Sequence, residues 1–377
     1  QNPSKKLPPL KPGDPIHNMK RAIEEKKAEP AVGDERGWWS WEEFGLKVDS
    51  YVLMLKNKNC LVGSHILISM KRRKEMTAMV AAAYVSGISF TCLDEELPPS
   101  RLLEIADLSS ATVVITDGDL TENSTGSVPW QDRKPDSCMY IVCTSGSTGE
   151  PKLAGVSCGS FNSALPSWVK LYGIDNFRVL QAASFSFDVF LGDLGRSLFL
   201  GGSLYISSEI ERRDPEILAN LCRDQQIDFL EVTPITACFW NQFPHSATGL
   251  NSLKVLVIGS EVWSMEDFFK TSKIAGANVK VFSSYGLSET TIDNTAFFTD
   301  DYEPKGRELN SNVPLGQPMI NTEITILNGD KLAKWGRKGE FCIGGPALGM
   351  GYFRGGSWDP HFIYKDKLGG KWFRTGD

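Results

Sequence analysis

Met139-Tyr140-Ile141-Val142-Cys143-Thr144-Ser145-Gly146-Ser147-Thr148-Gly149-Glu150-Pro151-Lys152 is a short apolar run that passes into small polar residues and closes on a proline and a lysine. Its five apolar residues predict a strand that is buried on both faces. The Ser, Thr and Gly residues leave backbone amides uncovered and permit the positive φ values of an anion-binding nest. Because Lys152 adds a positive charge, the stretch predicts a phosphate-binding loop. A polar surface loop after an edge strand is the alternative.

The stretch differs from two common nucleotide-binding loops. Only Glu150 and Pro151 separate Gly149 from the lysine, and no Ser or Thr follows Lys152 to hold magnesium. These features exclude a Walker loop, and the spacing of the glycines excludes a G-x-G-x-x-G dinucleotide turn.

The composition is that of an ordinary globular protein. The chain has 377 residues, of which 41% are hydrophobic and 23% are charged, so it is long enough for two or three subdomains around a large core. A net charge of −6 gives no general attraction to nucleic acid or to an anionic membrane, and neither is expected as a partner. The eight cysteines form no C-x-x-C pair, which indicates a reduced, cytoplasmic protein.

Targeting signals are not recognisable in the sequence. The most apolar region, Met79–Leu93, is interrupted by Ser and Gly and is too short to span a bilayer. The polar start at Gln1 has no apolar core behind it and therefore does not resemble a secretory signal. Since no methionine stands at the first position, we expect the chain to be a piece of a longer protein.

Strands and helices alternate over most of the chain, which predicts an α/β fold with doubly wound, mostly parallel sheets. Hairpin signals replace the helices from about Pro314, with an Asn328-Gly329-Asp330 turn, and predict a small β-barrel-like subdomain. We expect a leader at 1–14, α/β subdomains at 15–185 and 186–310, and the β subdomain at 311–377. The expected helices are Ile16–Lys27, Trp38 to Lys56 with an N-cap at Ser40 and Glu43 three residues on, Lys74–Val85, one from Pro99, Asp188–Leu200 and Pro215–Gln225. The expected strands are Ile66–Met70, Ile88–Leu93, Thr112–Thr116, Val179–Ala183, Ser203–Ile206, Phe229–Val232, Leu253–Ile258, Lys280–Phe282, Thr322–Leu327 and Gly339–Gly344.

Three further motifs follow the loop. In Ser283–Thr291, a tyrosine can stack on a planar base, a serine can donate to phosphate, and a glutamate can bind magnesium. Alone, this motif could equally be a helix start with an acid on the dipole. The glycine-rich motif Gly339–Tyr352 comes next, and in Phe373–Asp377 the final carboxylate could accept both hydroxyls of a ribose.

In this order the four motifs resemble the core motifs of the adenylate-forming superfamily, which includes acyl-CoA synthetases, luciferases and the adenylation domains of nonribosomal peptide synthetases. The resemblance covers nearly the whole chain. It implies catalytic roles for Lys152, Ser288 and Glu289, with Glu289 binding Mg²⁺. The implied ATP-binding residues are Thr144, Ser145, Gly146, Ser147, Thr148, Gly149, Lys152, Tyr285, Gly286, Ser288 and Asp377.

Three positions depart from the family pattern. Leu153 and Ala154 precede Gly155 where Pro-Lys-Gly is usual, Ser160 stands where a histidine is common, and Ser283 replaces an adenine-side asparagine. The resemblance further implies that the substrate carboxylate attacks the α-phosphorus of ATP. The phosphopantetheine thiol of a carrier protein, supplied with neighbouring synthetase domains, then captures the acyl-adenylate. The family's catalytic lysine lies in a C-terminal subdomain beyond Asp377, so we expect this core alone to form adenylate poorly.

Asp188 is the main indication of the substrate. In peptide-synthetase adenylation domains the matching aspartate pairs with the substrate α-ammonium, although an N-cap for the following helix is the simpler interpretation. The matching specificity positions resemble the pattern of ornithine-activating domains. They are Asp188, Val189, Gly192, Glu231, Val257, Gly259, Ser284, Ile292 and Asp293.

The chemistry of these residues agrees with ornithine. Gly192 leaves room for a long side chain, and Glu231 and Asp293 could converge on a distal ammonium, because buried carboxylates without cations are costly. Both acids could instead be an ordinary strand-end residue and a helix cap. An N-hydroxy, N-acyl ornithine for siderophore assembly is a competing substrate, and lysine differs by only one methylene.

Two other functions stay open from the sequence. An acyl-CoA ligase or a luciferase-like enzyme would need no partner for an α-ammonium, and Asp188 would then be incidental. A non-catalytic adenylate-binding module would explain the altered residues after Lys152.

Overall fold

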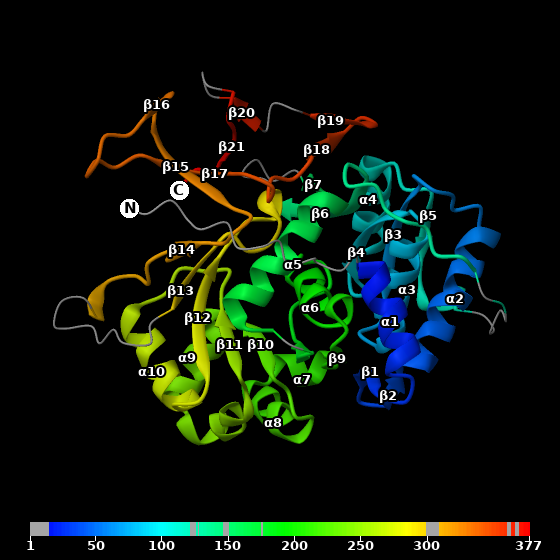
Figure 1. The fold of residues 1–377 in the computed structure, drawn as a ribbon, viewed down its shortest axis with the longest axis horizontal. Coiled ribbons are helices and arrows are strands. Elements are labelled where there is room, and N and C mark those ends of the chain that lie inside the picture. Colours follow the sequence, from blue (N-terminus) through cyan, green and yellow to red (C-terminus); the bar gives the residue numbers. More distant parts are fainter. Residues whose placement is uncertain are drawn as a thin grey trace.

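The computed structural model describes residues 15–120, 126, 128–145, 151–174, 176–298, 309–359, 363–365 and 369–377. Its described part contains three sheets, and Figure 1 shows a layer of helices between the two larger ones. The first core joins the inner faces of both larger sheets to this layer, through residues such as Phe90, Phe161 and Phe229. The predicted α/β class, with two mostly parallel sheets and a small β subdomain, is confirmed.

The seven-stranded sheet is parallel on one side and antiparallel on the other. Strands β6, β4, β3 and β5 run parallel, whereas β19, β18 and β7 are antiparallel to their neighbours. In spatial order the strands are β19 (Ser357–Asp359), β18 (Gly351–Arg354), β7 (Pro151–Ser157), β6 (Cys138–Ser145), β4 (Ser89–Asp94), β3 (His65–Met70) and β5 (Val113–Ile115).

The nine-stranded sheet has six parallel strands at its centre. Strands β12, β11, β10, β8, β9 and β1 are parallel, and β14, β13 and β2 add antiparallel pairs at the two sides. The order is β14 (Gln317–Pro318), β13 (Thr295–Phe298), β12 (Lys280–Tyr285), β11 (Val255–Ile258), β10 (Phe229–Val232), β8 (Arg178–Gln181), β9 (Ser203–Ile206), β1 (Pro30–Asp34) and β2 (Gly37–Ser40).

Helices cover both faces of each large sheet. The central layer contains α3 (Lys74–Val85), α5 (Cys158–Tyr172) and α6 (Val189–Arg196), and α3 is buried over nearly its whole length because it is apolar on every side. The outer face of the nine-stranded sheet packs on α8 (Pro215–Asp224), α9 (Pro234–Gln242) and α10 (Met265–Ala275), and that of the seven-stranded sheet packs on α4 (Pro99–Ser109). The remaining helices are α1 (Pro15–Glu25), α2 (Trp41–Asn57) and α7 (Glu209–Arg213).

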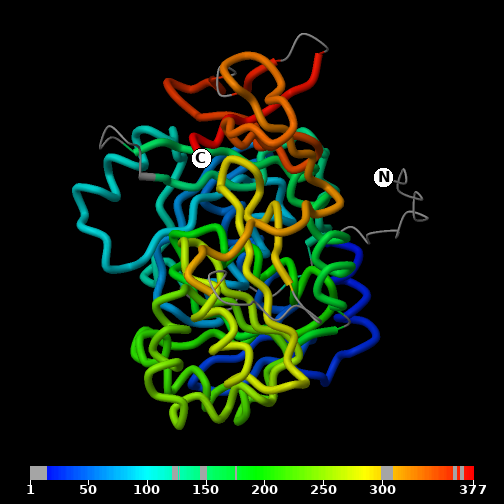
Figure 2. The backbone as a smooth tube through the Cα atoms, turned by 90° about the vertical axis from the view of Figure 1, so that its left-hand side faces the viewer, coloured from blue at the N-terminus to red at the C-terminus, as the bar shows by residue number. Residues whose placement is uncertain are grey.

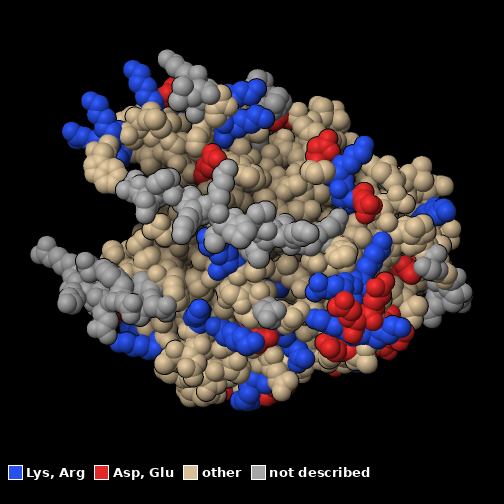
Figure 3. All heavy atoms as spheres, in the orientation of Figure 1, with Lys and Arg blue, Asp and Glu red and all other residues tan. Residues whose placement is uncertain are grey.

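The small sheet is antiparallel and sits at one end of the larger layers, as Figure 2 shows. Its order is β16 (Lys331–Leu332), β15 (Glu323–Asn328), β17 (Glu340–Gly344), β21 (Lys371–Arg374) and β20 (Ile363–Lys365). Figure 3 shows basic side chains gathered over the tip of this sheet, whereas positive and negative groups are interspersed elsewhere on the same face.

The sheets exchange strands across the boundaries expected at residues 185 and 310. β1, β2 and β8 join the second large sheet although they precede residue 186, and β18 and β19 join the first although they lie near the end of the chain. The helix expected from the stretch Trp38–Phe44 begins at Trp41, as its expected N-cap at Ser40 requires, and Gly37–Ser40 before it forms β2. The capping box of Ser40 and Glu43 is confirmed at that point.

Candidate functional site

The site lies where the central strands of the nine-stranded sheet face the middle layer of helices. Residues alternate along a strand, and Phe229, Val257 and Phe282 point into the core shared with this layer. Glu231 lies two residues after Phe229 and directly opposite Val257 in the parallel pair, so it faces the same side. β10 therefore presents a buried carboxylate to α6, close to the carboxyl ends of the strands where open α/β sheets bind ligands.

Asp188 precedes the first residue of α6 but does not cap the helix. Asp188 occupies the N-cap position, but its side chain makes no capping hydrogen bond to the helix. The interpretation of this carboxylate as a helix cap is therefore wrong. The side chain is 8% exposed, and Oδ2 has no hydrogen-bond partner among the described residues. Burial raises the pKa of Asp188 to about 6, against a hydrogen bond from the Ser288 side chain that lowers it. A buried carboxylate in this state can gain much from a ligand cation.

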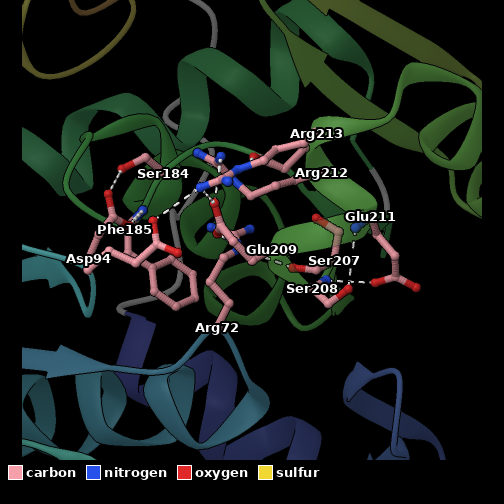
Figure 4. A network of polar contacts seen from close by, with 12 residues as sticks. Arg72, Asp94, Ser184, Phe185, Ser207, Ser208, Glu209, Glu211, Arg212 and Arg213 are labelled. Carbon is pink, nitrogen blue, oxygen red and sulfur yellow. Dashed lines mark hydrogen bonds and ion pairs between the residues drawn. The ribbon is translucent and has the colours of Figure 1, made fainter.

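The loop that carries Asp188 is tied to the first large sheet at the ends of β3 and β4 (Figure 4). Asp94 accepts hydrogen bonds from the Ser184 hydroxyl and from the backbone amide of Phe185, the second at 3.1 Å. Arg72 donates to the carbonyl oxygen of Ala183 at 2.7 Å, and its guanidinium lies 4.6 Å from the ring centre of Phe185. These contacts join the two large sheets across the site and fix the approach to α6.

Glu231 and Asp293 already have a cation within the protein. Arg196, the last residue of α6, is fully buried, and its Nη1 donates to Glu231 Oε2 at 2.5 Å. Its Nη2 donates to Asp293 Oδ2, which also accepts from Trp168 Nε1 at 3.0 Å. The two acids converge on Arg196, whereas their expected convergence on a substrate ammonium stays a prediction, and the premise that they lack a cation is wrong. Arg196 was not predicted from the sequence, because a single arginine in an apolar helix gives no local signal of its partners.

Three carboxylates surround the single positive charge of Arg196. Asp193 is the third, with Oδ1 3.4 Å from Arg196 Nη1. Burial raises the pKa of Asp193 well above its usual range and that of Glu231 to about 7, although Arg196 opposes both changes. For Arg196 burial alone would lower the pKa, but Glu231 and Asp293 raise it above the ordinary value. The cluster therefore holds an excess of negative charge that protonation or a further cation relieves.

The space expected beside Gly192 is filled. A Cβ on Gly192 would lie 3.2 Å from Arg196 Nη1 and 3.3 Å from Cζ, so the guanidinium occupies the room predicted for a long substrate side chain. A cavity of about 420 Å³ lies beside Glu231 and is also lined by Val189 and Val232, but Asp188, Gly192, Arg196 and Asp293 are not part of its lining. Glu231 Oε1 is turned toward Gly259, where a Cβ would lie 3.4 Å away.

Asp293 is held by an unusual backbone. Thr291 and Ile292 have φ values of 64° and 69°, in the left-handed region that β-branched residues rarely adopt. The Thr291 hydroxyl donates to the Ala347 carbonyl at 2.7 Å, and the backbone amide of Asp293 donates to the Thr291 carbonyl at 2.9 Å. Such strain is typical of functional sites.

The expected nucleotide residues form a second group after β12. The Tyr285 hydroxyl donates to Asp377 Oδ2 at 2.5 Å, which places the predicted adenine and ribose residues together. Tyr352 donates to Glu289 Oε1 at 2.6 Å, and Lys152 Nζ lies 5.3 Å from the centre of the Tyr352 ring. The predicted magnesium ligand and the predicted phosphate lysine therefore both lie against one tyrosine.

The other predicted residues lie close to these two groups. Ser284 lies on β12, and Gly286 and Ser288 follow that strand. The loop residues Gly146–Gly149 and the side chain of Ser145 lie outside what the structure describes. The loop itself connects β6 and β7, which pair as an antiparallel hairpin, and the Thr144 hydroxyl donates to the Lys152 carbonyl at 3.4 Å.

The residues at the three positions that depart from the family pattern pair or form hydrogen bonds within the fold. Leu153 and Ala154 are buried in β7, where Ala154 pairs with Tyr352 of β18. Ser160 donates to the Leu348 carbonyl at 2.7 Å, and Ser283 accepts from Trp263 Nε1 at 3.1 Å.

Over the described ranges, no helix has the length and apolar character needed to cross a membrane.

The geometry thus defines an α/β domain with a buried cluster of charged residues between α6 and β10 and a group of aromatic and acidic residues after β12. Residues 19–129 and 121–353 match the family model described as AMP-binding enzyme. The chain therefore belongs to the AMP-binding enzyme family.

Similar proteins are large synthetases and parts of them. The chain is 27% identical over 370 residues to gramicidin S synthase 2 of Brevibacillus brevis, covering 92% of this chain. It is 35% identical over 227 residues to a plipastatin synthase of Bacillus subtilis strain 168, covering 58% of this chain. The chain spans only 8% and 9% of the length of these two relatives.

Solved structures show the same fold. The N-terminal subdomain of Klebsiella oxytoca NpsA, in complex with 3-hydroxyanthranilyl-AMSN, aligns with a TM-score of 0.83 and 18% identity over 96% of this chain and 95% of its own. The AMPPNP-bound nonribosomal peptide synthetase FmoA3 aligns with a TM-score of 0.87 and 18% identity over 98% of this chain and 42% of its own. The fold is that of the large N-terminal part of an adenylation domain.

Proposed function

We propose that this chain activates an amino acid with a distal amino group, ornithine in the first place, as an aminoacyl-adenylate for nonribosomal peptide synthesis. The observation that carries this proposal is the distribution of buried carboxylates. Asp188 has no cationic partner among the described residues, and Asp193, Glu231 and Asp293 surround the single charge of Arg196. A substrate with an α-ammonium and a distal ammonium supplies one cation to each group.

The adenylation step needs no nucleophile from the protein. The substrate carboxylate attacks the α-phosphorus of ATP and pyrophosphate leaves, while positioned donors and a metal disperse the charge. Lys152, Ser288 and Tyr285 are the residues we assign to the nucleotide. Mg²⁺ is usually held by one or two carboxylates together with substrate phosphates, and Glu289 fits this use because Tyr352 engages Oε1 and leaves the second oxygen available.

The proposed partners are those of a synthetase. The phosphopantetheine thiol of a carrier domain would capture the adenylate, and neighbouring domains would use the thioester. This part of the proposal is supported by the synthetase relatives and by the synthetase fold.

ATP–pyrophosphate exchange on the full-length protein, with a panel of amino and fatty acids, tests the proposal. Ornithine should support exchange, and norvaline, which lacks the distal ammonium, should be poorer by about 10-fold or more, because the charge of Arg196 alone does not balance the three carboxylates around it. Exchange with fatty acids alone would overturn the assignment in favour of an acyl-CoA ligase. Equal exchange with norvaline and ornithine would overturn the distal-cation argument only.

The same panel separates the related substrates. An N-hydroxy, N-acyl ornithine has no distal cation, so we expect it to be as poor as norvaline. Preference for this compound over ornithine would instead assign the site to siderophore assembly. No exchange with any acid by the intact protein would favour a non-catalytic module.

A further inference from the structure

Glu340, the first residue of β17, holds the turn that leads to Asp377. Its Oε1 accepts a hydrogen bond from the Gly376 amide at 3.2 Å. Its Oε2 accepts from Arg374 Nε at 2.7 Å and lies 2.5 Å from Arg374 Nη2. Arg374 ends β21, which pairs with β17, and residues 375–377 follow it directly. The Glu340 carboxylate therefore bridges the last residue of a strand and the backbone of the turn after it.

Backbone contacts with Phe341 complete this turn. The Thr375 hydroxyl donates to the Phe341 carbonyl at 2.7 Å, and the Phe341 amide donates to the Asp377 carbonyl at 2.9 Å. Gly376 lies between them with a φ of 84°, in the left-handed region that favours glycine, although a Cβ there would meet no atom within 4 Å. The glycine therefore serves the backbone conformation that turns its amide toward Glu340, and not a close contact.

The same turn carries the residue that the sequence assigns to the ribose. Asp377 is exposed, so packing of its side chain does little to fix its direction. Its Oδ2 accepts from the Tyr285 hydroxyl at 2.5 Å, and the Tyr285 ring lies edge-on to the Phe341 ring with 5.7 Å between the ring centres. Two neighbouring residues of β17 thus contact the predicted nucleotide residues, Glu340 through Gly376 and Phe341 through Tyr285.

We propose that Glu340 is a positioning residue for the ribose of ATP, because it holds the Gly376 amide and thereby sets the Asp377 carboxylate to accept both ribose hydroxyls. This inference rests on the proposed function and on the prediction that Asp377 binds the ribose. Hydrogen bonds from Arg374 lower the pKa of the Glu340 carboxyl. They favour the ionised form, which accepts hydrogen bonds more strongly than the neutral one.

A purely structural role for Glu340, the fastening of β21 to β17, makes a different prediction. Loss of such a fastening would loosen this side of the small sheet and weaken the binding of every nucleotide alike. Loss of a positioning residue would weaken only the binding of nucleotides that carry ribose hydroxyls. ATP and 2′,3′-dideoxy-ATP, which lacks both hydroxyls, therefore separate the two roles.

Calorimetry with each nucleotide and Mg²⁺, on the full-length protein, tests the inference. The unmodified protein should bind ATP tighter than dideoxy-ATP by about 10-fold or more, because a hydrogen bond to a charged group contributes at least this factor. In Glu340→Ala this preference should fall to about 3-fold or less, while the affinity for dideoxy-ATP changes by less than about 2-fold. An unchanged preference in a variant that urea denaturation shows to be folded, or equal losses for both nucleotides, would overturn the inference.

Two further variants guard against an effect of charge or folding. Glu323 is an exposed acid at the start of β15 in the same sheet, opposite Gly344 at the far end of β17. Glu323→Ala removes the same charge and should leave the preference for ATP unchanged, and a fall as large as that in Glu340→Ala would overturn the inference. Glu340→Gln retains an oxygen for the Gly376 amide and should keep most of the preference. A glutamine variant as poor as the alanine variant would overturn the role of this hydrogen bond.

The measurements on the unmodified protein separate this inference from the proposed function. If the unmodified protein binds no ATP, the proposed function fails. If it binds ATP and dideoxy-ATP equally, the assignment of Asp377 to the ribose fails, and the inference fails with it. If it prefers ATP and Glu340→Ala retains that preference, only the inference about Glu340 fails.

Discussion

Replacing Asp188 with alanine should separate substrate binding from stability. The carboxylate is buried without a cationic partner and makes no cap hydrogen bond to α6, so the folded protein gains nothing from its charge. The rise of its pKa from 3.8 to about 6 corresponds to about 3 kcal/mol against the ionised form. We therefore expect Asp188→Ala to leave the free energy of unfolding at pH 7.5 unchanged or higher.

The effect on binding should have the opposite sign. A ligand ammonium that loses its buried carboxylate costs about 3–5 kcal/mol, which is a loss of about 100- to 1,000-fold or more in affinity. Calorimetry with the ornithinyl-adenylate analogue measures this loss, and urea denaturation of the same samples measures stability. Exchange of ATP and pyrophosphate by the full-length variant should be abolished.

Asp214 offers a matched control at a similar position. It is also an N-cap aspartate, but its Oδ1 accepts hydrogen bonds from the amides of Glu216 and Ile217 at 2.9 and 3.2 Å. Asp214→Ala should lower the free energy of unfolding by about 1 kcal/mol and leave analogue binding unchanged. A destabilised Asp188→Ala protein with unaltered affinity would refute the assignment and restore a purely structural role.

The structure predicts the direction of the change in stability or binding for three further substitutions. Burial raises the pKa of Glu231 from 4.5 to about 7, so between these pH values the native state binds more protons than the unfolded chain. The free energy of unfolding should therefore fall as pH rises from 4.5 to about 7. Urea denaturation measures this fall, and Glu231→Gln should lack the contribution of Glu231 to it. Tyr352→Phe removes the hydrogen bond that orients Glu289, and calorimetry with AMPPNP should show an affinity loss of up to about 10-fold with Mg²⁺ and little change without it. Arg72→Met removes the hydrogen bonds of Arg72, including the one to Ala183 in the loop before Asp188. It should lower the free energy of unfolding by about 2–4 kcal/mol and weaken analogue binding. Unchanged binding and unchanged stability would show that these hydrogen bonds do not hold the loop in place.

Elements with strong local signals could be predicted from the sequence. The capping box at Ser40 and Glu43 defines the start of α2 through contacts three residues apart, and the apolar run of α3 predicts its bounds. The parallel pairing of the central strands could be predicted from their alternation with helices. Asp188, Glu231 and Asp293 could be proposed as site residues because the family motifs fix their places in the chain, and the structure shows that all three are buried.

Features that depend on distant contacts could not be predicted. β1 pairs with β9, and β18 pairs with β7, across about 170 and 200 residues, and no local pattern specifies such partners. The left-handed backbone at Thr291 and Ile292 contradicts the preferences of both residues and is imposed by their surroundings. These non-local contacts bring Asp293 to Arg196, so the sequence could propose the acid as a site residue but could not predict its partner.

The position of Arg196 changes how the acidic residues should be understood. Without it, Glu231 and Asp293 would be unpaired until a substrate arrived, and the empty site would bear the cost of two buried charges. With it, both carboxylates are held and oriented in the free protein, whereas Asp188 has no cationic partner among the described residues. In the proposed function the substrate α-ammonium therefore meets an unpaired carboxylate, whereas a distal ammonium meets carboxylates that Arg196 already holds, and we expect the first contact to contribute more binding energy.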